Sequence, residues 1–178
     1  MKSLNSSRQL LYSLLVVGTI FFPRASMAQN AFELKAALTY NFAKFTQWPE
    51  ARLNPPSAWK ICFFGNQYHD SFLGLSDKKL GNQSVIAIEL SEISQVGQCD
   101  VVFVDTNSRE LTHRLLLAVD NKAILTVSDI TGFAMQGGMI EIVEQDKRLF
   151  FKVNMQVLEK SGLTISSQVL KLALDVKR

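Results

Sequence analysis

The sequence has few of the residues that hold metal ions or act as catalytic nucleophiles and bases. It contains only two cysteines and two histidines among 178 residues. Cys62 and Cys99 stand alone, and His69 and His113 show no spacing that would place paired ligands on one face of an element. We therefore expect no metal ion, and nothing indicates another cofactor.

The sequence also lacks the motifs of common catalytic sites. It has no Gly-x-Ser-x-Gly motif, which argues against a serine hydrolase of that kind. Gly137 and Gly138 have neither the spacing nor the Lys-Ser/Thr pair of a phosphate-binding loop. Two carboxylates that meet in a cleft stay open as an alternative, but no pattern favours them. We expect that the protein is not an enzyme.

No apolar run is long enough to span a membrane. The longest, Leu10 to Phe22, is apolar except for small or weakly polar residues and has 13 residues, whereas a spanning helix needs about 20. Lys2 and Arg8 precede this run, and the small residues of Ser26–Ala28 follow it. This order is typical of a cleaved secretory signal peptide. An uncleaved membrane anchor is the alternative, which the short run disfavours.

The signal peptide is predicted to cover residues 1–28, with cleavage between Ala28 and Gln29. Its three charged residues are all basic, so their removal from a total of 19 leaves 16 basic residues against 16 acidic ones. The exported chain, residues 29–178, is therefore neutral and has no basic excess for binding nucleic acid. Its 150 residues fit one domain with a core of its own.

The two cysteines are predicted to form a disulfide. Cys62 lies in an apolar run and Cys99 directly before another, and disulfides persist in the compartments that exported proteins reach. A bridge closing a loop of this size would stabilise the fold by about 4 kcal/mol. The alternative is two buried free thiols that pack as small apolar residues.

The apolar pattern predicts a single α/β domain with a mainly parallel sheet flanked by helices. A helix over 31–45 buries Leu34, Leu38, Phe42 and Phe45 and is ended by Pro49, and residues 53–59 form a loop. Four strands and two helical segments follow and alternate along the chain, which favours parallel pairing with right-handed crossovers. Because the link from Leu90 to Asp100 is barely long enough for such a crossover, the place of the second strand is open. The strands are 60–64, 85–90, 100–105 and 123–127, and the helical segments 70–75 and 109–120.

The pattern changes after Ser128. Apolar stretches at 139–143 and 149–153 flank a charged turn and predict a hairpin, with a tight backbone approach at Gly137-Gly138 before it. A final helix is predicted to start at Ser166 or Ser167 and to pack into the core. Its apolar stripe consists of Val169, Leu170, Leu172, Ala173 and Val176.

Asp105 ends a buried strand, at the place where open parallel sheets bind ligands. It is similar to the phospho-acceptor aspartate of receiver domains, but Gly65 and Asn66 stand where a receiver would have acidic residues for Mg²⁺. We therefore expect Asp105 to cap the following turn. The crevice that such sheets form near Gly65-Asn66 and Asp105-Thr106-Asn107 also suggests a second hypothesis, an exported domain that binds a small molecule.

Three stretches together resemble the YfiR family, over about residues 31–176. Any one of them is weak, but their order and spacing make the set specific. They are Leu34-Lys35-Ala36-Ala37 through Tyr40-Asn41-Phe42-Ala43-Lys44-Phe45 to Trp48-Pro49; Gly132-Phe133-Ala134 with Gly137-Gly138-Met139-Ile140; and Gly162-Leu163-Thr164-Ile165-Ser166-Ser167-Gln168-Val169-Leu170-Lys171-Leu172-Ala173.

The resemblance implies a periplasmic regulator. It implies repression of an inner-membrane diguanylate cyclase through its periplasmic sensor domain, which lowers cyclic di-GMP and biofilm formation. It also implies an outer-membrane, peptidoglycan-binding lipoprotein that sequesters the regulator, and a homodimer. The partner-binding surface stays unknown. Relatives carry a second cysteine pair that this chain lacks, so Cys62 and Cys99 are left as the only pair and strong redox sensing is not expected.

Overall fold

The computed structural model describes residues 25–49 and 57–178, with side chains from residue 31 onward. The predicted signal peptide therefore lies largely outside the described residues, as does most of the predicted loop at 53–59. The chain order is α1 Ala25–Lys44, β1 Thr46–Gln47, β2 Ala58–Phe64, η2 Asn66–Tyr68, α2 His69–Leu73, β3 Lys79–Leu80, β4 Gln83–Glu89, η3 Ile93–Gln98, β5 Val101–Val104, η4 Thr106–Leu111, α3 Thr112–Val119, β6 Leu125–Ser128, β7 Ile140–Gln145, β8 Arg148–Asn154, α4 Met155–Lys160, β9 Thr164–Ile165, α5 Ser167–Leu170 and β10 Asp175–Lys177.

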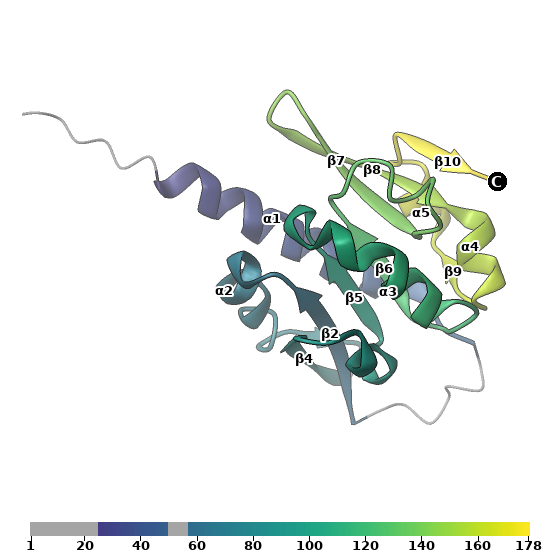
Figure 1. Cartoon of the computed structure of the whole chain (residues 1–178), viewed down its shortest axis with the longest axis horizontal. Coiled ribbons are helices and arrows are strands. Elements are labelled where there is room, and N and C mark those ends of the chain that lie inside the picture. The colour runs from purple at the N-terminus through teal and green to yellow at the C-terminus, as the bar shows by residue number, and fades with distance from the viewer. Residues whose placement is uncertain (1–24, 50–56) are drawn as a thin grey trace, which may run out of the picture.

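Within the described residues, eight strands form one sheet in the order β10-β8-β7-β6-β5-β2-β4-β3 (Figure 1). The central strands pair in parallel from β4 through β2, β5 and β6 to β7. The two hairpins, β3 with β4 and β7 with β8, are antiparallel, and β10 adds to β8 in parallel. The predicted fold class, a mainly parallel sheet flanked by helices, is confirmed.

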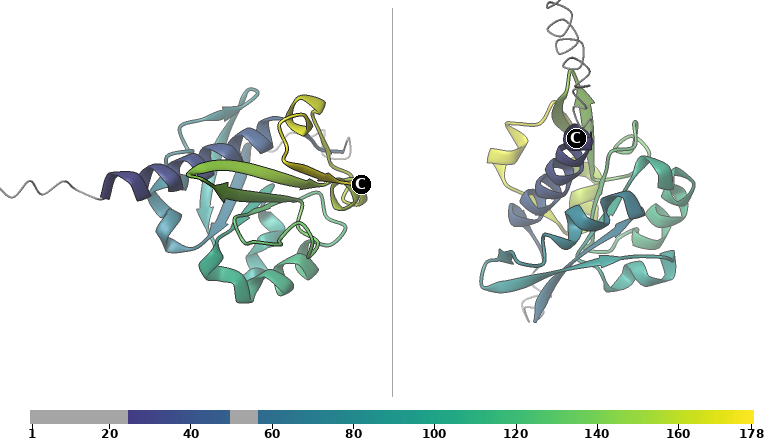
Figure 2. Two further views of the ribbon diagram at one scale, coloured as in Figure 1. Left: turned by 90° about the horizontal axis from the view of Figure 1, so that it is seen from above. Right: turned by 90° about the vertical axis from the view of Figure 1, so that its left-hand side faces the viewer.

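The central strands are covered on both faces, which explains their continuous apolar sequence. Side chains alternate along β2, so Ile61 and Phe63 join the core beneath α1 and α2, whereas Cys62 and Phe64 join the core beneath η3 and α3. Figure 2 (left) shows α1 and α3 on opposite sides of the sheet. The alternation therefore divides the protein into two apolar layers.

The second predicted strand, β4, lies nearer the edge of the sheet than the first predicted strand, β2. β4 pairs with β2, and η3 then carries the chain over β2 to β5 on the other side. The connection from β4 to β5 is therefore a short 3₁₀ helix, because few residues separate Leu90 from Asp100. The N-terminus of η3 is fixed by a capping box, in which the Glu92 side chain and the Gln95 side chain each bond the other's backbone N–H.

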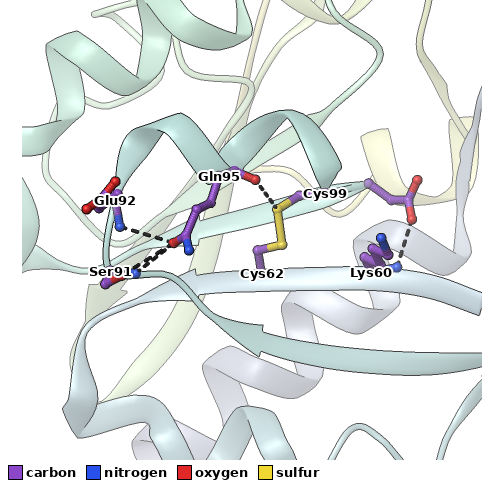
Figure 3. Close-up of a disulfide and its surroundings, with 7 residues drawn as sticks. Lys60, Cys62, Ser91, Glu92, Gln95 and Cys99 are labelled. Carbon is purple, nitrogen blue, oxygen red and sulfur yellow. Dashed lines mark hydrogen bonds between the residues drawn. A yellow bond between two sulfur atoms is a disulfide. The ribbon is translucent and has the colours of Figure 1, made fainter.

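The predicted disulfide is present and ties η3 to the strand below it (Figure 3). Cys62 of β2 and Cys99 after η3 have Cα atoms 5.9 Å apart, and both residues are fully buried. Beside the bridge, the Lys60 backbone N–H donates to Asp100 Oδ2 at 2.7 Å, and the Asp100 N–H donates back to the Lys60 carbonyl at 2.9 Å. The start of β5 is therefore held to β2 by covalent and hydrogen bonds together.

The first helix differs from its prediction in its end and in its buried face. It ends at Lys44, before Pro49, because Thr46 Oγ1 bonds the Phe42 carbonyl and β1 then pairs with β9. Leu34 and Phe45 are partly exposed. The face that lies on the sheet carries mainly small side chains, which allow a close approach: Ala36, Thr39, Phe42 and Ala43.

The helix predicted over 109–120 is shorter, because residues 106–111 form η4 and α3 begins at Thr112. The predicted strands are confirmed with shifted ends: β2 starts at Ala58, inside the expected loop, and β6 starts at Leu125. The β7–β8 hairpin is confirmed and is longer than predicted. Helix α4 and the short strands β1, β3 and β9 have no counterpart in the sequence analysis.

The predicted C-terminal helix is wrong beyond its first turn. Ser166 caps it as expected, with its hydroxyl accepting from the Gln168 N–H, but α5 ends at Leu170. The chain then extends, the Leu174 N–H donates to the Phe151 carbonyl of β8, and β10 follows directly and pairs with β8. Pairing with the open edge of β8 competes successfully with the helix, and it leaves Leu172 and Leu174 mostly exposed.

Replacing both bridged cysteines with alanine should lower the free energy of unfolding by about 4 kcal/mol, because the bridge closes a loop with a sequence separation of 37 residues. In a domain of this size, the melting temperature should fall by roughly 10 °C. Circular dichroism melts of the wild type and the double variant measure both quantities. An unchanged melting temperature, or two thiols titrating per native wild-type chain, would contradict the prediction.

Candidate functional site

Three residues follow the ends of neighbouring parallel strands and so meet at one edge of the sheet. Gly65 follows β2, Asp105 follows β5 and Asp129 follows β6. Both carboxyl groups are buried, since Asp105 is fully inaccessible and the Asp129 side chain is 6% exposed. The sequence analysis named the first two positions and missed Asp129, although it follows the third buried strand in the same way.

Asp129 is paired with two residues from the side of the sheet that α1 and α2 cover. Lys35 of α1 places its Nζ 2.8 Å from Asp129 Oδ2, and the Tyr68 hydroxyl donates to the same oxygen at 2.7 Å. Lys35 Nζ also lies 3.4 Å from the Tyr68 hydroxyl, and the Phe32 ring packs edge-on against the Tyr68 ring. A charged hydrogen-bond network therefore fastens α1 to the carboxyl edge of the sheet.

The Tyr68 hydroxyl is held in its protonated form. Burial and, next, the neighbouring Asp129 carboxylate raise the pKa of Tyr68 well above its usual range. Tyr68 therefore acts only as a donor toward Asp129 at physiological pH. The ring is fixed by contacts with Phe72 and Phe103, whose centroids lie 6.1 and 4.8 Å away.

Asp105 does not act as the expected side-chain cap. It occupies the N-cap position of η4, and its backbone carbonyl accepts from the Ser108 N–H, but its carboxylate makes no capping bond. Instead, Oδ2 accepts from Gln67 Nε2 at 2.6 Å. The carboxylate also presses on Gly65, whose φ is +106° and where an added Cβ would lie 2.5 Å from Oδ2. Glycine is required there by both the backbone and the space.

A pocket of about 280 Å³ opens beside this network. Its charged groups are three carboxylates and two lysine ammonium groups, so the lining is mildly acidic. Glu141 is almost fully buried and accepts from the Gly132 and Ala134 N–H groups at 3.1 and 3.2 Å. The lining residues are Lys35, Thr106, Asp129, Thr131, Glu141, Ile142, Val143, Glu144 and Lys152.

The glycine-rich motif before the hairpin lies next to this pocket, between the lining residues Thr131 and Glu141. Its turn holds Phe133 in the core, and a Cβ on Gly138 would lie 2.1 Å from that ring, so the predicted close approach is confirmed. Asn154 Nδ2 donates to the Ala134 carbonyl at 2.7 Å and fixes the turn to β8. The motif is thus a structural turn that also orients Glu141.

The first and third sequence motifs meet in space, although more than a hundred residues separate them. β1 pairs with β9, and the Ser166 N–H donates to the Phe45 carbonyl at 2.9 Å. Trp48 Nε1 donates to the Ala123 carbonyl at 2.9 Å, and its ring packs on Trp59. These contacts of the motifs are therefore packing contacts of the fold, as expected for Phe42.

The histidines do not build a site. His69 Nδ1 lies 2.6 Å from Glu89 Oε2 in an exposed pair. No group of three or more His, Cys, Asp or Glu side chains in residues 25–49 and 57–178 is arranged to hold a metal ion. No helix in this described part of the chain is long and apolar enough to cross a membrane.

These features define a single α/β domain with a mainly parallel sheet and a polar pocket at the carboxyl edge of its strands. A family model described as YfiR/HmsC-like matches residues 32–174, and the chain belongs to this family. The family is one of periplasmic regulators linked to cyclic di-GMP signalling, and its members are regulators rather than enzymes. A comparison with curated protein sequences finds no match.

Solved structures share the fold at low sequence identity. A conserved domain protein from Vibrio cholerae O1 biovar eltor str. N16961 is 12% identical, with a TM-score of 0.57 over 82% of this chain. The ABC domain in complex with L-Trp from Streptococcus pneumonia is also 12% identical, with a TM-score of 0.58 over 80% of this chain. This chain spans 60% of the length of each of these proteins.

Replacing Lys35 with methionine should destabilise the protein by about 3 kcal/mol, because Asp129 would stay buried without its cationic partner. The double variant Lys35→Met/Asp129→Asn should regain part of this loss. Lys160→Met is the matched control, since Lys160 pairs with Asp120 at 2.9 Å while both side chains are more than half exposed, and it should cost less than about 1 kcal/mol. Urea unfolding measures the free energy of unfolding of all three variants. Equal losses of stability in Lys35→Met and Lys160→Met would contradict a special role for Lys35.

Proposed function

We propose that the protein represses an inner-membrane diguanylate cyclase by binding the periplasmic sensor domain of that enzyme. Membership of the YfiR/HmsC-like family, over residues 32–174, is the observation that carries this proposal. Repression keeps cyclic di-GMP low and limits biofilm formation. An outer-membrane, peptidoglycan-binding lipoprotein relieves the repression by sequestering the regulator, which acts as a homodimer.

Export is part of this proposal. Residues 1–28 are the signal peptide, residues 29–178 form the regulatory domain, and cleavage between Ala28 and Gln29 releases it into the periplasm. The helix α1 begins at Ala25, so cleavage would remove only its first residues. The contacts of Phe32 and Lys35 with the rest of the domain would remain.

Deleting the gene should raise cellular cyclic di-GMP and surface attachment, because the cyclase loses its repressor. Mass spectrometry of nucleotide extracts and a surface-attachment assay measure the two effects. Complementation with the full chain should reverse both. A chain that starts at Gln29 after an initiating methionine is the matched control, and it should fail because it stays on the wrong side of the inner membrane.

Unchanged cyclic di-GMP in the deletion strain, together with no membrane cyclase co-purifying with the tagged protein, would refute repression. Full complementation by the chain without residues 1–28 would refute export but would leave repression of the cyclase in place. The two parts of the proposal can therefore fail separately.

A second function is favoured by the pocket at the carboxyl edge of the sheet. Open parallel sheets bind ligands at this edge, and the pocket of about 280 Å³ combines polar groups with a buried floor. We propose that the domain binds a small molecule there. Binding a ligand and repressing a cyclase are compatible, because occupancy of the pocket can tune the repressor.

A ligand that binds the folded protein should raise its melting temperature in proportion to its affinity and concentration. A thermal-shift screen of the purified protein against nucleotides and amino acids tests this second function. Glu144→Gln is a suitable comparison, since Glu144 lines the pocket and its side chain is half exposed, and any shift that the wild type shows should change in this variant. A flat response of the wild type across the panel would count against small-molecule binding.

A further inference from the structure

The two borders of the sheet differ in how their outward-facing backbone groups are used. At one border, β3 pairs with the first residues of β4 only, and side chains and loop carbonyls take over from there. The Val85 N–H donates to the Lys78 carbonyl at 3.0 Å, and the Ala87 N–H donates to Ser76 Oγ at 3.3 Å. At the other border, β10 is the last strand (Figure 1), and the described part of the chain adds no strand beyond it.

The pairing of β8 shows which groups of β10 point outward. The Asn154 N–H donates to the Met139 carbonyl at 2.8 Å, on the β7 side. Backbone groups alternate along a strand, so the preceding residue, Val153, faces β10. Val153 is in register with Val176, and in a parallel pair a residue bonds the two neighbours of its partner. The N–H and the carbonyl of Val176 therefore point away from the sheet.

The sequence of β10, Asp175–Lys177, is complementary to itself. When two copies of the strand lie antiparallel about a two-fold axis, the outward groups of Val176 bond those of Val176 in the second copy. Asp175 of each copy then lies opposite Lys177 of the other copy, at positions where cross-strand side chains are close. Asp175 and Lys177 are exposed, and neither forms an ion pair with another residue that the structure describes.

The charges on β10 select one orientation of the second copy. Charged side chains on a short edge strand generally discourage pairing with other chains. A parallel pairing in register would place Asp175 against Asp175 and Lys177 against Lys177, whereas the antiparallel pairing joins opposite charges twice. Leu172 and Leu174, just before the strand, are 73% and 51% exposed. They supply apolar surface beside the same edge.

We propose that two copies of this protein pair along β10 in antiparallel orientation, so that one sheet continues through both molecules. The inference rests on the homodimer in the first proposed function, and it assigns a surface to that homodimer. The contact consists of the backbone of Val176, two pairs of Asp175 with Lys177, and the leucines beside them. Because the paired segment is short, the dimer dissociates on dilution.

Sedimentation equilibrium of the purified exported protein, over a range of concentrations, measures dimerisation. Asp175→Lys and Lys177→Asp should each weaken it about tenfold or more, because both cross-strand pairs become repulsive. An equimolar mixture of these two variants should recover it, since opposite charges then meet at both pairs. The double variant Asp175→Lys/Lys177→Asp should dimerise as the wild type does. Asp77→Lys is the matched control, because it makes the same charge change at an exposed residue before β3, and it should have no effect.

Val176→Pro tests the backbone pairing separately from the charges. It removes an N–H that points outward, whereas the N–H groups that bond β8 remain. Dimerisation should weaken about tenfold or more. Val176→Thr keeps both the N–H and a branched side chain, so it should dimerise as the wild type does. Circular dichroism melts check the folding of each variant, and the charge variants decide the question if the proline variant does not fold.

Dimerisation that resists these variants, or a mixture of Asp175→Lys with Lys177→Asp that stays monomeric, would overturn pairing along β10. Either result would leave a homodimer through another surface in place. A wild type that is monomeric at every concentration would overturn both the pairing and the homodimer. Repression of the cyclase is measured independently in the deletion strain, so it can stand when the pairing fails.

Discussion

The whole architecture depends on the double-sided burial of the parallel strands β2 and β5. A strand that is apolar on both faces needs cover above and below, and here α1 and α2 supply one layer and η3 and α3 the other. The crossover through η3, the disulfide beneath it and the small side chains on the inner face of α1 all serve this close cover. The same parallel arrangement brings the residues after β2, β5 and β6 to one edge, where the polar pocket lies.

Features encoded in local patterns could be predicted from the sequence. The buried strands, the hairpin and the cysteine pair follow from apolar runs, from a charged turn and from compartment chemistry. The C-terminal helix could not be predicted correctly, because the choice between helix and strand after Leu170 depends on the free edge of β8. The predicted buried face of α1 was also wrong. The prediction followed the spacing of the large apolar residues, whereas the small residues Ala36 and Ala43 lie against the sheet.

The polar network is the least predictable part. Lys35 and Asp129 are 94 residues apart, and neither belongs to a recognisable motif of charged residues. Asp105 stood out in sequence because of its position after a strand, but its pairing with Gln67 and its contact with Gly65 arise only from the fold. The family motifs mark mainly packing contacts, although Lys35 of the first motif belongs to the polar network. They identify the family through its core and say little about what the pocket binds.

The complete burial of the disulfide also fixes when it can respond to its surroundings. Because both cysteines are inaccessible in the folded protein, an oxidant or a thiol reagent reaches them only while η3 is detached from β2. That condition holds for every chain before it has folded and afterwards only during rare openings of the core. The bridge is therefore set while the chain folds, and in the folded protein it exchanges only as fast as the core opens.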